Sequence, residues 1–402
     1  MLWIMNNPAK ADTLWPCNNT RQRPLILTLN PGSSSLKAGW FNLNGEALAA
    51  SQNLAVNWQA EGAAAEALTA LLAAAPPRPL TCILHRVVHG GDHFHGPARL
   101  TPEVRDTIAR LAQLAPLHNP VSLALIRECE QRLPGLTQFA LFDTAFHHTL
   151  PEAAARYALP TALTQQYGIR RYGFHGLSHA AVTRRAAEAL ARPLENLNLL
   201  SLHLGHGASA CAIAGGRSVD TSMGMTPTEG LVMGTRSGDV DAGALLHLLN
   251  HAGFDSAQLD TLLNRDSGLR GLCGEADMRK VRAAADQGDA TARVALDVYV
   301  HRLRRYIGAF TAVLGRVDAL VFTGGVGEND AALRAEACAR LDALGIQIDP
   351  ARNSQPLFDV DTGTAKISMP SSAVTLLVIR ADEEQEMVRQ WRAIFQEPGE
   401  IV

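Results

Sequence analysis

The 402-residue sequence predicts an α/β protein of two domains, with mixed sheets flanked by helices and a ligand cleft between the domains. The chain is long for one hydrophobic core and suits two cores of roughly 150–200 residues each. Strand-like apolar runs alternate with helical periodicity, and strand–turn–strand units among them favour mixed sheets. The halves also share a motif, because LNPGSS at 29–34 and LGHGAS at 204–209 both place glycine and serine after an apolar strand. We therefore expect a duplicated domain that holds a nucleotide between its copies.

The composition excludes several classes of protein. With 47% hydrophobic and 19% charged residues, the chain resembles an ordinary globular protein. A formal net charge of −3 argues against nucleic-acid binding, and no apolar run reaches the roughly 18–20 residues of a membrane span. The six cysteines lie apart without a C-x-x-C pair, which favours reduced thiols in a cytoplasmic protein. Residues 1–23 lack signal-peptide features, so we expect either a disordered extension or a start codon placed too early.

In the first half, strands at Leu25–Leu29 and Leu36–Leu43 are expected to form a hairpin turned at Asn44-Gly45. An alanine-rich helix at Ala63–Ala75 should end at Pro76-Pro77, because proline disfavours a helical residue before it. The other elements expected here are strands at Cys82–Val88 and Gln138–Phe142 and helices after Thr101 and after Pro120.

The second half starts again with a helix at Ser178–Ala191, for which Ser178 should be the N-cap. A hairpin should turn at Gly215-Gly216. The other elements expected here are strands at Leu197–Leu204, Ala208–Ala214, Asp318–Phe322 and Val374–Ile379, a long helix around Arg293–Leu314, a helix from Asp330 and a charged terminal helix.

A serine-rich turn follows the first strand, in LILTLNPGSSSLK at 25–37. Asn30, Gly32, the serines at 33–35 and Lys37 supply backbone N–H groups, hydroxyls and a cation at one strand end. A phosphate chain and its Mg²⁺ need such groups. The spacing differs from G-x-x-x-x-G-K-[ST], so this is not a Walker A loop. A hairpin with a serine-rich turn is the structural alternative.

Two further strands end in charged residues. Arg86 precedes a glycine turn in HRVVHGG, where its planar guanidinium can bind a carboxylate or phosphate through two parallel hydrogen bonds; a structural salt bridge is the alternative. Asp143 follows a strand in FDTAFHH, at a sheet end of the kind where α/β enzymes place reacting groups, unless it only caps the next segment. His147 and His148 after it are expected to be structural, because no third metal ligand with suitable spacing is evident.

Glycine-bearing turns carry the other candidates. His175 lies in RRYGFHGLSH before a helix. The strained turn expected there costs conformational free energy, which favours a functional role for its residues. Arg236 lies between glycines in GTRSGD, and a backbone that must approach an anion closely requires glycine. FTGGVGEN at 322–329 allows a flat ring or phosphate near a helix N-terminus. Glu383-Glu384 is typical of an acidic first helical turn.

Together, nine segments resemble the acetate kinase family, the short-chain acyl-phosphate kinases of the acetate and sugar kinase/Hsp70/actin superfamily. They are, in family order over about residues 25–395, LNPGSSSLK, HRVVHGG, LHNP, FDTAFHHTLP, RRYGFHGLSH, HLGHGAS, TPTEGLVMGTRSGD, FTGGVGEN and DEE. The resemblance implies two ribonuclease-H-like (actin-like ATPase) domains, an N-terminal acyl- and Mg²⁺-side domain at 24–150 plus 381–402 and a nucleotide-binding domain at 151–380. It also implies a homodimer that uses Mg²⁺, or Mn²⁺ in its place, and ATP to phosphorylate acetate or another short-chain carboxylate. Neither a nucleic acid nor a membrane is implied as a partner.

The resemblance also implies roles for residues at matching positions. Asn30 and Glu383 should lie near Mg²⁺, Lys37 near the nucleotide, and Arg86 at the substrate carboxylate. The catalytic acid matches Asp143, and the transition-state stabilisers match His175 and Arg236. The methyl pocket matches Val88, Leu117, Phe174 and Pro227. The nucleotide contacts match His203, Leu204, Gly205, His206, Gly207, Asp277, Met278, Arg279, Gly325, Val326, Gly327, Glu328 and Asn329.

Elementary chemistry supports most of these roles and questions one. Phosphoryl transfer depends on positioning and charge stabilisation, which Arg236 and His175 can supply to the equatorial oxygens. Acetate is already ionised near neutral pH, since carboxyl pKa values are about 4, and it therefore needs no base. We expect Asp143 to orient Mg²⁺ or its waters rather than to transfer a proton.

Two segments depart from the family pattern. His206 lies where the family usually has asparagine, and an imidazole beside phosphates should strengthen nucleotide binding as the pH falls towards about 6. The segment 271–276, before Asp277, is also unusual, which leaves the adenine-side contacts open. A different donor such as GTP or pyrophosphate is disfavoured because the segment 325–329 is intact.

The nearest alternative is a propionate or butyrate kinase of the same family, since each methylene changes binding by only about 1–3 kcal/mol. Val88, rather than a smaller residue, favours acetate. A sugar or glycerol kinase would need a base that activates a hydroxyl and an aspartate-glycine phosphate turn, which Asn30-Pro31-Gly32 does not supply. An actin-like filament or Hsp70-like chaperone would lack the acyl-pocket arginine, and a chaperone would need a peptide-binding domain after residue 380, where only 22 residues follow.

Overall fold

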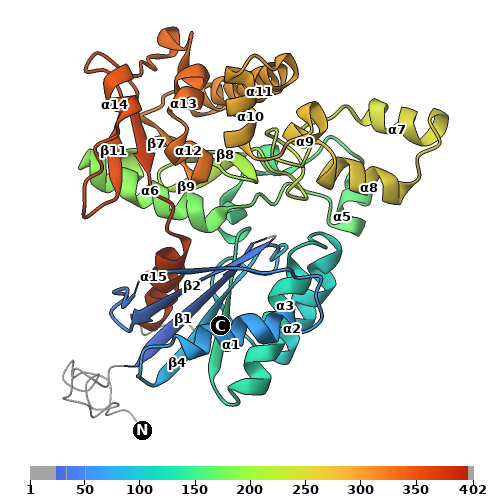
Figure 1. Cartoon of the computed structure of the whole chain (residues 1–402), viewed down its shortest axis with the longest axis vertical. Coiled ribbons are helices and arrows are strands. Elements are labelled where there is room, and N and C mark those ends of the chain that lie inside the picture. The colour runs from blue at the N-terminus through green and yellow to red at the C-terminus, as the bar shows by residue number, and fades with distance from the viewer. Residues whose placement is uncertain (1–23, 33, 50, 397–402) are drawn as a thin grey trace.

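The computed structural model describes residues 24–32, 34–49 and 51–396, so the expectation for residues 1–23 lies outside the described part. It contains two six-stranded sheets with helices packed on their faces (Figure 1). The strands of the first sheet are β1 (Leu25–Pro31), β2 (Ser35–Asn42), β3 (Gln52–Ala55), β4 (Leu80–Val87), β5 (Ala98–Arg99) and β6 (Thr137–Phe142). Those of the second are β7 (Asn198–Leu204), β8 (Ala208–Ala214), β9 (Arg217–Thr221), β10 (Ala319–Thr323), β11 (Thr364–Lys366) and β12 (Thr375–Ile379).

The two sheets have the same topology. The first has the order β3-β2-β1-β4-β6-β5 and the second β9-β8-β7-β10-β12-β11. In each, the first three strands form an antiparallel meander, the fourth and sixth run parallel to the first, and the fifth pairs antiparallel at the edge. The sheets are therefore mixed, as predicted, and the repeated turn motif belongs to a repeat of the whole sheet.

The turn between β1 and β2 is not the expected one. Pro31 pairs with Leu36, so the chain reverses at 32–34, where the Gly32 N–H donates to the Ser35 carbonyl at 2.8 Å. Asn44-Gly45 instead turns the chain after β2, towards a single bridge between Phe41 and Ala47. The prediction of a hairpin between these two strands is confirmed, but its turn was placed at the wrong end of the second strand.

Helices cover the first sheet on both faces. They are α1 (Ala63–Ala73), α2 (Pro102–Arg110), η3 (Leu111–Gln113), α3 (Asn119–Arg132) and α15 (Glu383–Gln396). Leu68 and Leu71 of α1 and Leu125 of α3 pack against one face. Met387 and Val388 of α15 pack against the other, so the last helix of the chain lies on the first sheet.

The remaining helices belong to the second half and to its connections. They are η4 (Ala145–Thr149), α4 (Glu152–Ala155), α5 (Thr161–Tyr167), α6 (Gly176–Leu190), η5 (Leu194–Asn196), α7 (Ala242–His251), α8 (Ser256–Arg265), α9 (Gly268–Cys273), α10 (Met278–Asp286), α11 (Ala290–Leu314), α12 (Gly324–Asn329), α13 (Ala331–Cys338), η6 (Asp342–Leu344) and α14 (Pro350–Ser354). The long helix α11 covers one face of the second sheet and α6 the other. In the described part of the chain, no helix has the length and apolar character needed to cross a membrane.

Helix α6 begins earlier than expected. It starts at Gly176 after His175, whose left-handed φ of 56° makes it the N-cap, so the prediction of Ser178 as N-cap is wrong. The Ser178 hydroxyl instead lies 2.8 Å from His203 Nδ1. The position of Ser178 near a helix start predicts a cap, but in the fold its hydroxyl contacts an imidazole on the adjacent strand β7.

Candidate active site

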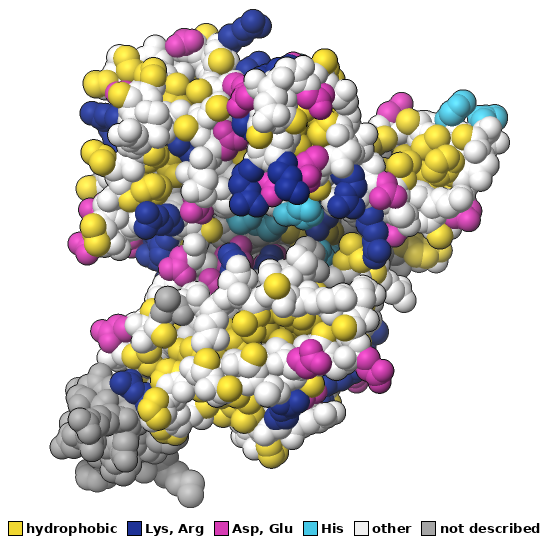
Figure 2. Space-filling view, in the orientation of Figure 1, with side chains coloured by type: hydrophobic (Ala, Val, Ile, Leu, Met, Phe, Trp, Pro, Cys, Tyr) yellow, Lys and Arg dark blue, Asp and Glu magenta, His cyan; other side chains and the backbone are white. Residues whose placement is uncertain are grey.

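A cavity of about 650 Å³ lies between the two sheets and takes its walls from both halves of the chain. Figure 2 shows the hollow between the two parts of the molecule, with histidine and basic side chains on its upper wall. The lining residues are Asn30, Pro31, Gly32, Ser34, Ser35, Lys37, Arg86, Val88, His118, Asp143, Phe174, His175, His203, Gly205, His206, Gly207, Pro227, Arg236, Gly324, Gly325, Glu328, Ala381, Glu383 and Glu384. We call this cavity the cleft.

Polar and charged side chains from three adjacent strand ends meet at the floor of the cleft. Strands β1, β4 and β6 are parallel neighbours, so their carboxyl ends lie at one edge of the sheet. Arg86 donates to both carboxylate oxygens of Asp143, from Nε at 2.9 Å and Nη2 at 2.6 Å. Its Nη1 donates to Asn30 Oδ1 at 2.9 Å. The amide of Asn30 donates in turn to Glu383 at 2.8 Å and Glu384 at 2.7 Å, which joins α15 to the floor.

This network divides the protons among its acids. Burial raises the pKa of Asp143, although the Arg86 guanidinium opposes the rise. Burial also acts on Glu383, but Arg86 and His203 hold the pKa of Glu383 below its ordinary value. The pKa of Glu384 is raised by burial and by Glu383 beside it. Glu383 is therefore the carboxylate most firmly held in its ionised form, beside the Asn30 amide.

Two imidazoles and a guanidinium line the opposite wall. His175 and His203 are stacked at 4.3 Å between ring centroids. Burial and the neighbouring imidazole lower the pKa of His175 well below its usual value, and burial lowers the pKa of His203 to about 4. Burial and Arg86 lower the pKa of Arg236 to about 10, so near pH 7 this wall presents neutral imidazoles and a charged guanidinium.

The turn between β7 and β8 lies beside His175 and Arg236. The Gly205 N–H donates to the Gly207 carbonyl at 2.9 Å, which closes the turn. A Cβ atom on Gly207 would lie 3.4 Å from His175 Nε2 and 3.5 Å from Arg236 Nη1. The absent side chain thus leaves open the space beside these two nitrogens, of which Arg236 Nη1 also donates to the Pro227 carbonyl at 3.1 Å.

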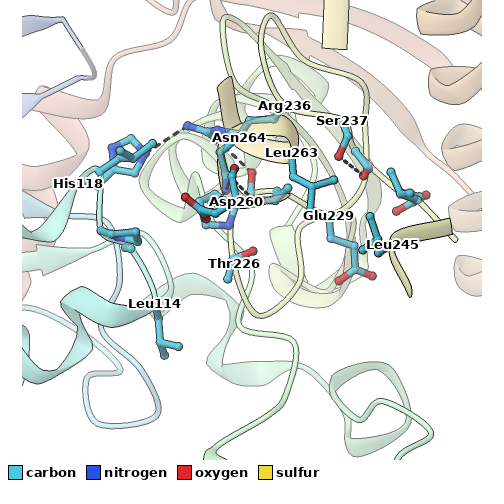
Figure 3. Close-up of a pocket in the computed structure, with 18 of the residues that line it drawn as sticks. Leu114, His118, Thr226, Glu229, Arg236, Ser237, Leu245, Asp260, Leu263 and Asn264 are labelled. Carbon is cyan, nitrogen blue, oxygen red and sulfur yellow. Dashed lines mark hydrogen bonds between the residues drawn. The ribbon is translucent and has the colours of Figure 1, made fainter. Parts of the chain in front are cut away.

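The apolar residues of the expected methyl pocket do not all lie in the cleft. Val88, Phe174 and Pro227 line it, whereas Leu117 lines two adjoining cavities of about 630 and 680 Å³. Figure 3 shows the first of these, where Arg236 reaches His118. The Arg236 Nη2 donates to His118 Nε2 at 3.2 Å, since burial and Arg236 lower the pKa of His118 to about 3 and keep its ring neutral.

Most of the expected nucleotide contacts line a fourth cavity of about 880 Å³. It shares Gly205, His206 and Gly325 with the cleft, so the two cavities adjoin. Asp277, Met278, Arg279, Val326 and Asn329 also line it. Of the other expected contacts, His203, Gly207 and Glu328 line only the cleft, whereas Leu204 and Gly327 line none of these cavities and belong to the buried end of β7 and to α12.

Several lining residues were not expected from the sequence. Tyr299 lines the fourth cavity, and its buried hydroxyl has no hydrogen-bond partner among the described residues. A tyrosine in the middle of a long helix gives no local signal, because its role appears only when α11 packs beside the cavity. Glu384, expected only as part of an acidic first helical turn, and His118, which lies in the LHNP segment, both line the cleft. The Tyr299 hydroxyl is thus a buried polar group beside this cavity that no described residue satisfies.

The floor of the cleft also offers the oxygen ligands that Mg²⁺ prefers. Asn30, Glu383 and Glu384 present amide and carboxylate oxygens, and the Asn30 oxygen uses only one lone pair on Arg86. Within 24–32, 34–49 and 51–396, no three His, Cys, Asp or Glu side chains are grouped to hold a metal alone. This donor set fits a metal held mainly by phosphates and water, with one or two carboxylates from the protein.

Comparisons with known proteins agree on one family. The model of the acetokinase family matches residues 50–389. The acetate kinase of Leifsonia xyli is 56% identical over 312 residues, which is 78% of each chain. The crystal structure of Porphyromonas gingivalis acetate kinase has a TM-score of 0.81 and 36% identity, covering 93% of this chain and all of that one. A propionate kinase from Francisella tularensis has a TM-score of 0.83 and 35% identity, covering 91% of this chain and 98% of the other.

Proposed function

This chain belongs to the acetokinase family, and on that premise we propose that it is an acetate kinase. It transfers the γ-phosphoryl group of ATP to the carboxylate of acetate, in a reversible in-line reaction that gives acetyl phosphate and ADP. The observation that carries the proposal is the convergence of His175 and Arg236 on the space over Gly207, opposite Arg86. A cation and a neutral N–H donor there can stabilise charge on the phosphoryl oxygens.

Arg86 is the proposed anchor for the substrate carboxylate. Three of its five N–H groups donate to Asp143 and Asn30, which leaves two for a ligand. Val88, Phe174 and Pro227, which line the cleft with Arg86, are proposed to take the methyl group. A carboxylate oriented by a fixed guanidinium reaches the phosphorus along one line, which lowers the entropic part of the barrier.

Mg²⁺ is proposed to bind beside Asn30 and Glu383, where it would neutralise phosphate charge when bound. Asp143 holds Arg86 in place through both carboxylate oxygens, a partner that was not expected for it. We retain the proposal that Asp143 orients the metal or its waters rather than transferring a proton. The attacking carboxylate has no proton to lose near pH 7.

The nucleotide is proposed to span the cleft and the fourth cavity. The phosphates would lie near Lys37, His203 and the 205–207 turn. The base would lie among residues of the fourth cavity, with Tyr299 as an added contact. The cavities adjoin at His206 and Gly325, which supports a ligand that passes from one to the other.

The domain boundaries, oligomeric state and location are proposals as well. We keep residues 24–150 with 381–402 as one domain and 151–380 as the other, supported by the packing of α15 on the first sheet. A homodimer is supported by α5 and α7, which bury none of their residues within the chain and expose Leu163, Tyr167 and Leu246. Light scattering on the purified protein in solution measures its molecular mass and thereby tests the homodimer. A cytoplasmic location is supported by the free cysteines of the described residues.

Trapping of the product as a hydroxamate tests the function. The protein is incubated with Mg²⁺-ATP and acetate, propionate or butyrate, with hydroxylamine present. We expect the highest kcat/KM with acetate, because Val88 narrows the apolar wall. A preference for propionate or butyrate would assign the chain to the alternative kinase of the same family. Absence of product with all three acids would defeat the proposal.

A further inference from the structure

A chain of hydrogen bonds runs from the cleft into the core of the second half. His175 Nδ1 lies 2.9 Å from Ser209 Oγ, and the same hydroxyl lies 2.8 Å from His179 Nε2. His179 Nδ1 then lies 2.9 Å from Ser201 Oγ. Ser209 and His179 are fully buried and Ser201 is 1% exposed, so solvent does not compete for these hydrogen bonds. Ser201 belongs to β7, Ser209 to β8 and His179 to α6, while His175 is the N-cap residue that precedes α6.

The inner end of this chain sets the direction of every bond in it. Ser201 Oγ has no other hydrogen-bond partner among the described residues, and a buried hydroxyl hydrogen without an acceptor is costly. Its hydrogen therefore goes to His179 Nδ1. Both imidazoles are neutral, because burial lowers the pKa of His175 and of His179 well below the usual value. A neutral ring that accepts at one nitrogen donates from the other.

The remaining hydrogens follow in order. His179 donates from Nε2 to Ser209, and the Ser209 hydroxyl then donates to His175 Nδ1. The hydrogen of His175 is thereby placed on Nε2, the nitrogen 3.4 Å from the position of a Cβ on Gly207. Stacking on His203 and the left-handed backbone at His175 hold the ring in this orientation.

We propose that Ser209 is a positioning residue which, together with His179 and Ser201, holds His175 as its Nε2–H tautomer, a neutral donor to the transferring phosphoryl group. The role of the donor rests on the proposed phosphoryl transfer, but the tautomer is a property of the resting enzyme. In the other tautomer the Nε2 lone pair would face the phosphoryl oxygens and repel them. The hydrogen bond gained only as charge develops would then be lost.

The test combines nuclear magnetic resonance with kinetics on the full-length enzyme. Histidine labelled with ¹⁵N in the ring reports which nitrogen carries the hydrogen, and comparison with His175→Ala identifies the His175 signals. We expect the Nε2–H form in the wild type and a mixture of both tautomers in Ser209→Ala. We also expect kcat to fall about tenfold in Ser209→Ala with both KM values within about twofold, since the lost interaction belongs to the transition state.

Ser218→Ala is the matched control. Ser218 is equally buried and lies 2.8 Å from His147 Nδ1, but it is not part of the hydrogen-bond chain from His175 to Ser201. It should leave the His175 tautomer and kcat unchanged. If Ser209→Ala does not fold, Ser201→Ala takes its place. Ser201 lies at the inner end of the hydrogen-bond chain, and its loss is expected to give the same mixture of His175 tautomers. An Nδ1–H tautomer in the wild type, or an unchanged tautomer in a folded Ser209→Ala or Ser201→Ala, would overturn the proposal. A wild type without kinase activity would defeat the proposed function, yet the tautomer could still be read.

Discussion

At the scale of single residues, the floor of the cleft is a network in which one cation serves several acids and an amide. Arg86 is only 13% exposed and is held on three sides by Asp143, Asn30 and, at 3.8 Å, Glu383. Removal of one member of such a buried pair leaves the other charge poorly compensated. Substitutions within the network should therefore affect both the orientation of Arg86 and the stability of the fold.

Asp143→Asn tests this network. The amide has only one acceptor oxygen, so Arg86 loses one of its two bonds to residue 143. We expect kcat/KM for acetate to fall about hundredfold, a change of about 2.7 kcal/mol, and the half-saturating Mg²⁺ concentration to rise. Asp318→Asn is the control, since Asp318 bonds Arg192 at 2.8 Å and lines none of the four cavities described here. An unchanged Mg²⁺ dependence with a lost titrating group would favour proton transfer instead.

The position of His206 at the cleft predicts how the KM for ATP depends on pH. The expectation of tighter nucleotide binding near pH 6 needs revision, because partial burial and Arg236 lower the pKa of His206 below 6.5. The imidazole is therefore neutral at pH 7 and gains its charge only at more acidic pH. We expect the KM for ATP to change little near pH 7 and to decrease only when the solution is acidified past the ordinary range of histidine. The same measurement on His206→Asn should give a flat profile, and two identical profiles would contradict the prediction.

At the scale of elements, two glycines next to β7 have opposite reasons to lack a side chain. Gly324, after β10, has a φ of 78°, and a Cβ there would lie 2.7 Å from the Leu204 carbonyl oxygen. Gly207 lies in the turn after β7, and a Cβ there would meet nothing closer than 3.4 Å. The first glycine serves the packing of α12 on β7, and the second keeps the cleft open.

Alanine at the two positions should separate stability from activity. Gly324→Ala should lower the free energy of unfolding by about 2 kcal/mol or more, because positive φ and close contact act together. Gly207→Ala should change it by less than about 1 kcal/mol but lower kcat at least about hundredfold, since the methyl group enters the space before His175 and Arg236. Urea unfolding and steady-state kinetics measure both. A fully active Gly207→Ala enzyme would mean that the phosphoryl group lies elsewhere.

At the scale of the whole molecule, the repeated sheet places its two turns on opposite sides of one cleft. The β1–β2 turn lies beside Lys37 and the β7–β8 turn beside His175. Buried imidazoles accumulate around this arrangement, because α6, β4 and η4 pack histidines into the cores. Burial lowers the pKa of His85 and of His147 to about 4 each.

These buried histidines should make the fold labile in acid. These histidines become protonated near pH 6.5 in the unfolded chain but only near pH 4 in the folded chain. Between these values the unfolded state binds more protons, so the free energy of unfolding decreases as the pH is lowered. Each should reduce the free energy of unfolding by about 2 kcal/mol between pH 7.5 and 5.0. Urea midpoints at both pH values measure the loss. His147→Asn should lessen it, whereas exposed His247→Asn should not, and equal losses in all three proteins would contradict the assignment.

The sequence predicted the mixed sheets, the positions of the main strands along the chain and most of the segments that line the cleft. These features are local, because alternating apolar runs, glycine turns and strand-end charges are recorded in a few consecutive residues each. The helices between 242 and 286 were not predicted, although α8, α9 and α10 each bury apolar residues. The turn at Asn44-Gly45 was recognised but assigned to the wrong strand pair, because a turn signal does not state which strands it joins.

The sequence by itself therefore determined which chemical groups are present and at which strand ends and turns they stand. Only the tertiary structure decided their partners. Asn30 meets Glu383 and Glu384 across 353 and 354 residues, and Ser209 meets His175 and His179 across 34 and 30 residues. Such contacts depend on strand register and on the packing of α6 and α15, which no local pattern encodes. The same packing placed Leu117 outside the cleft and directed the His175 hydrogen into it.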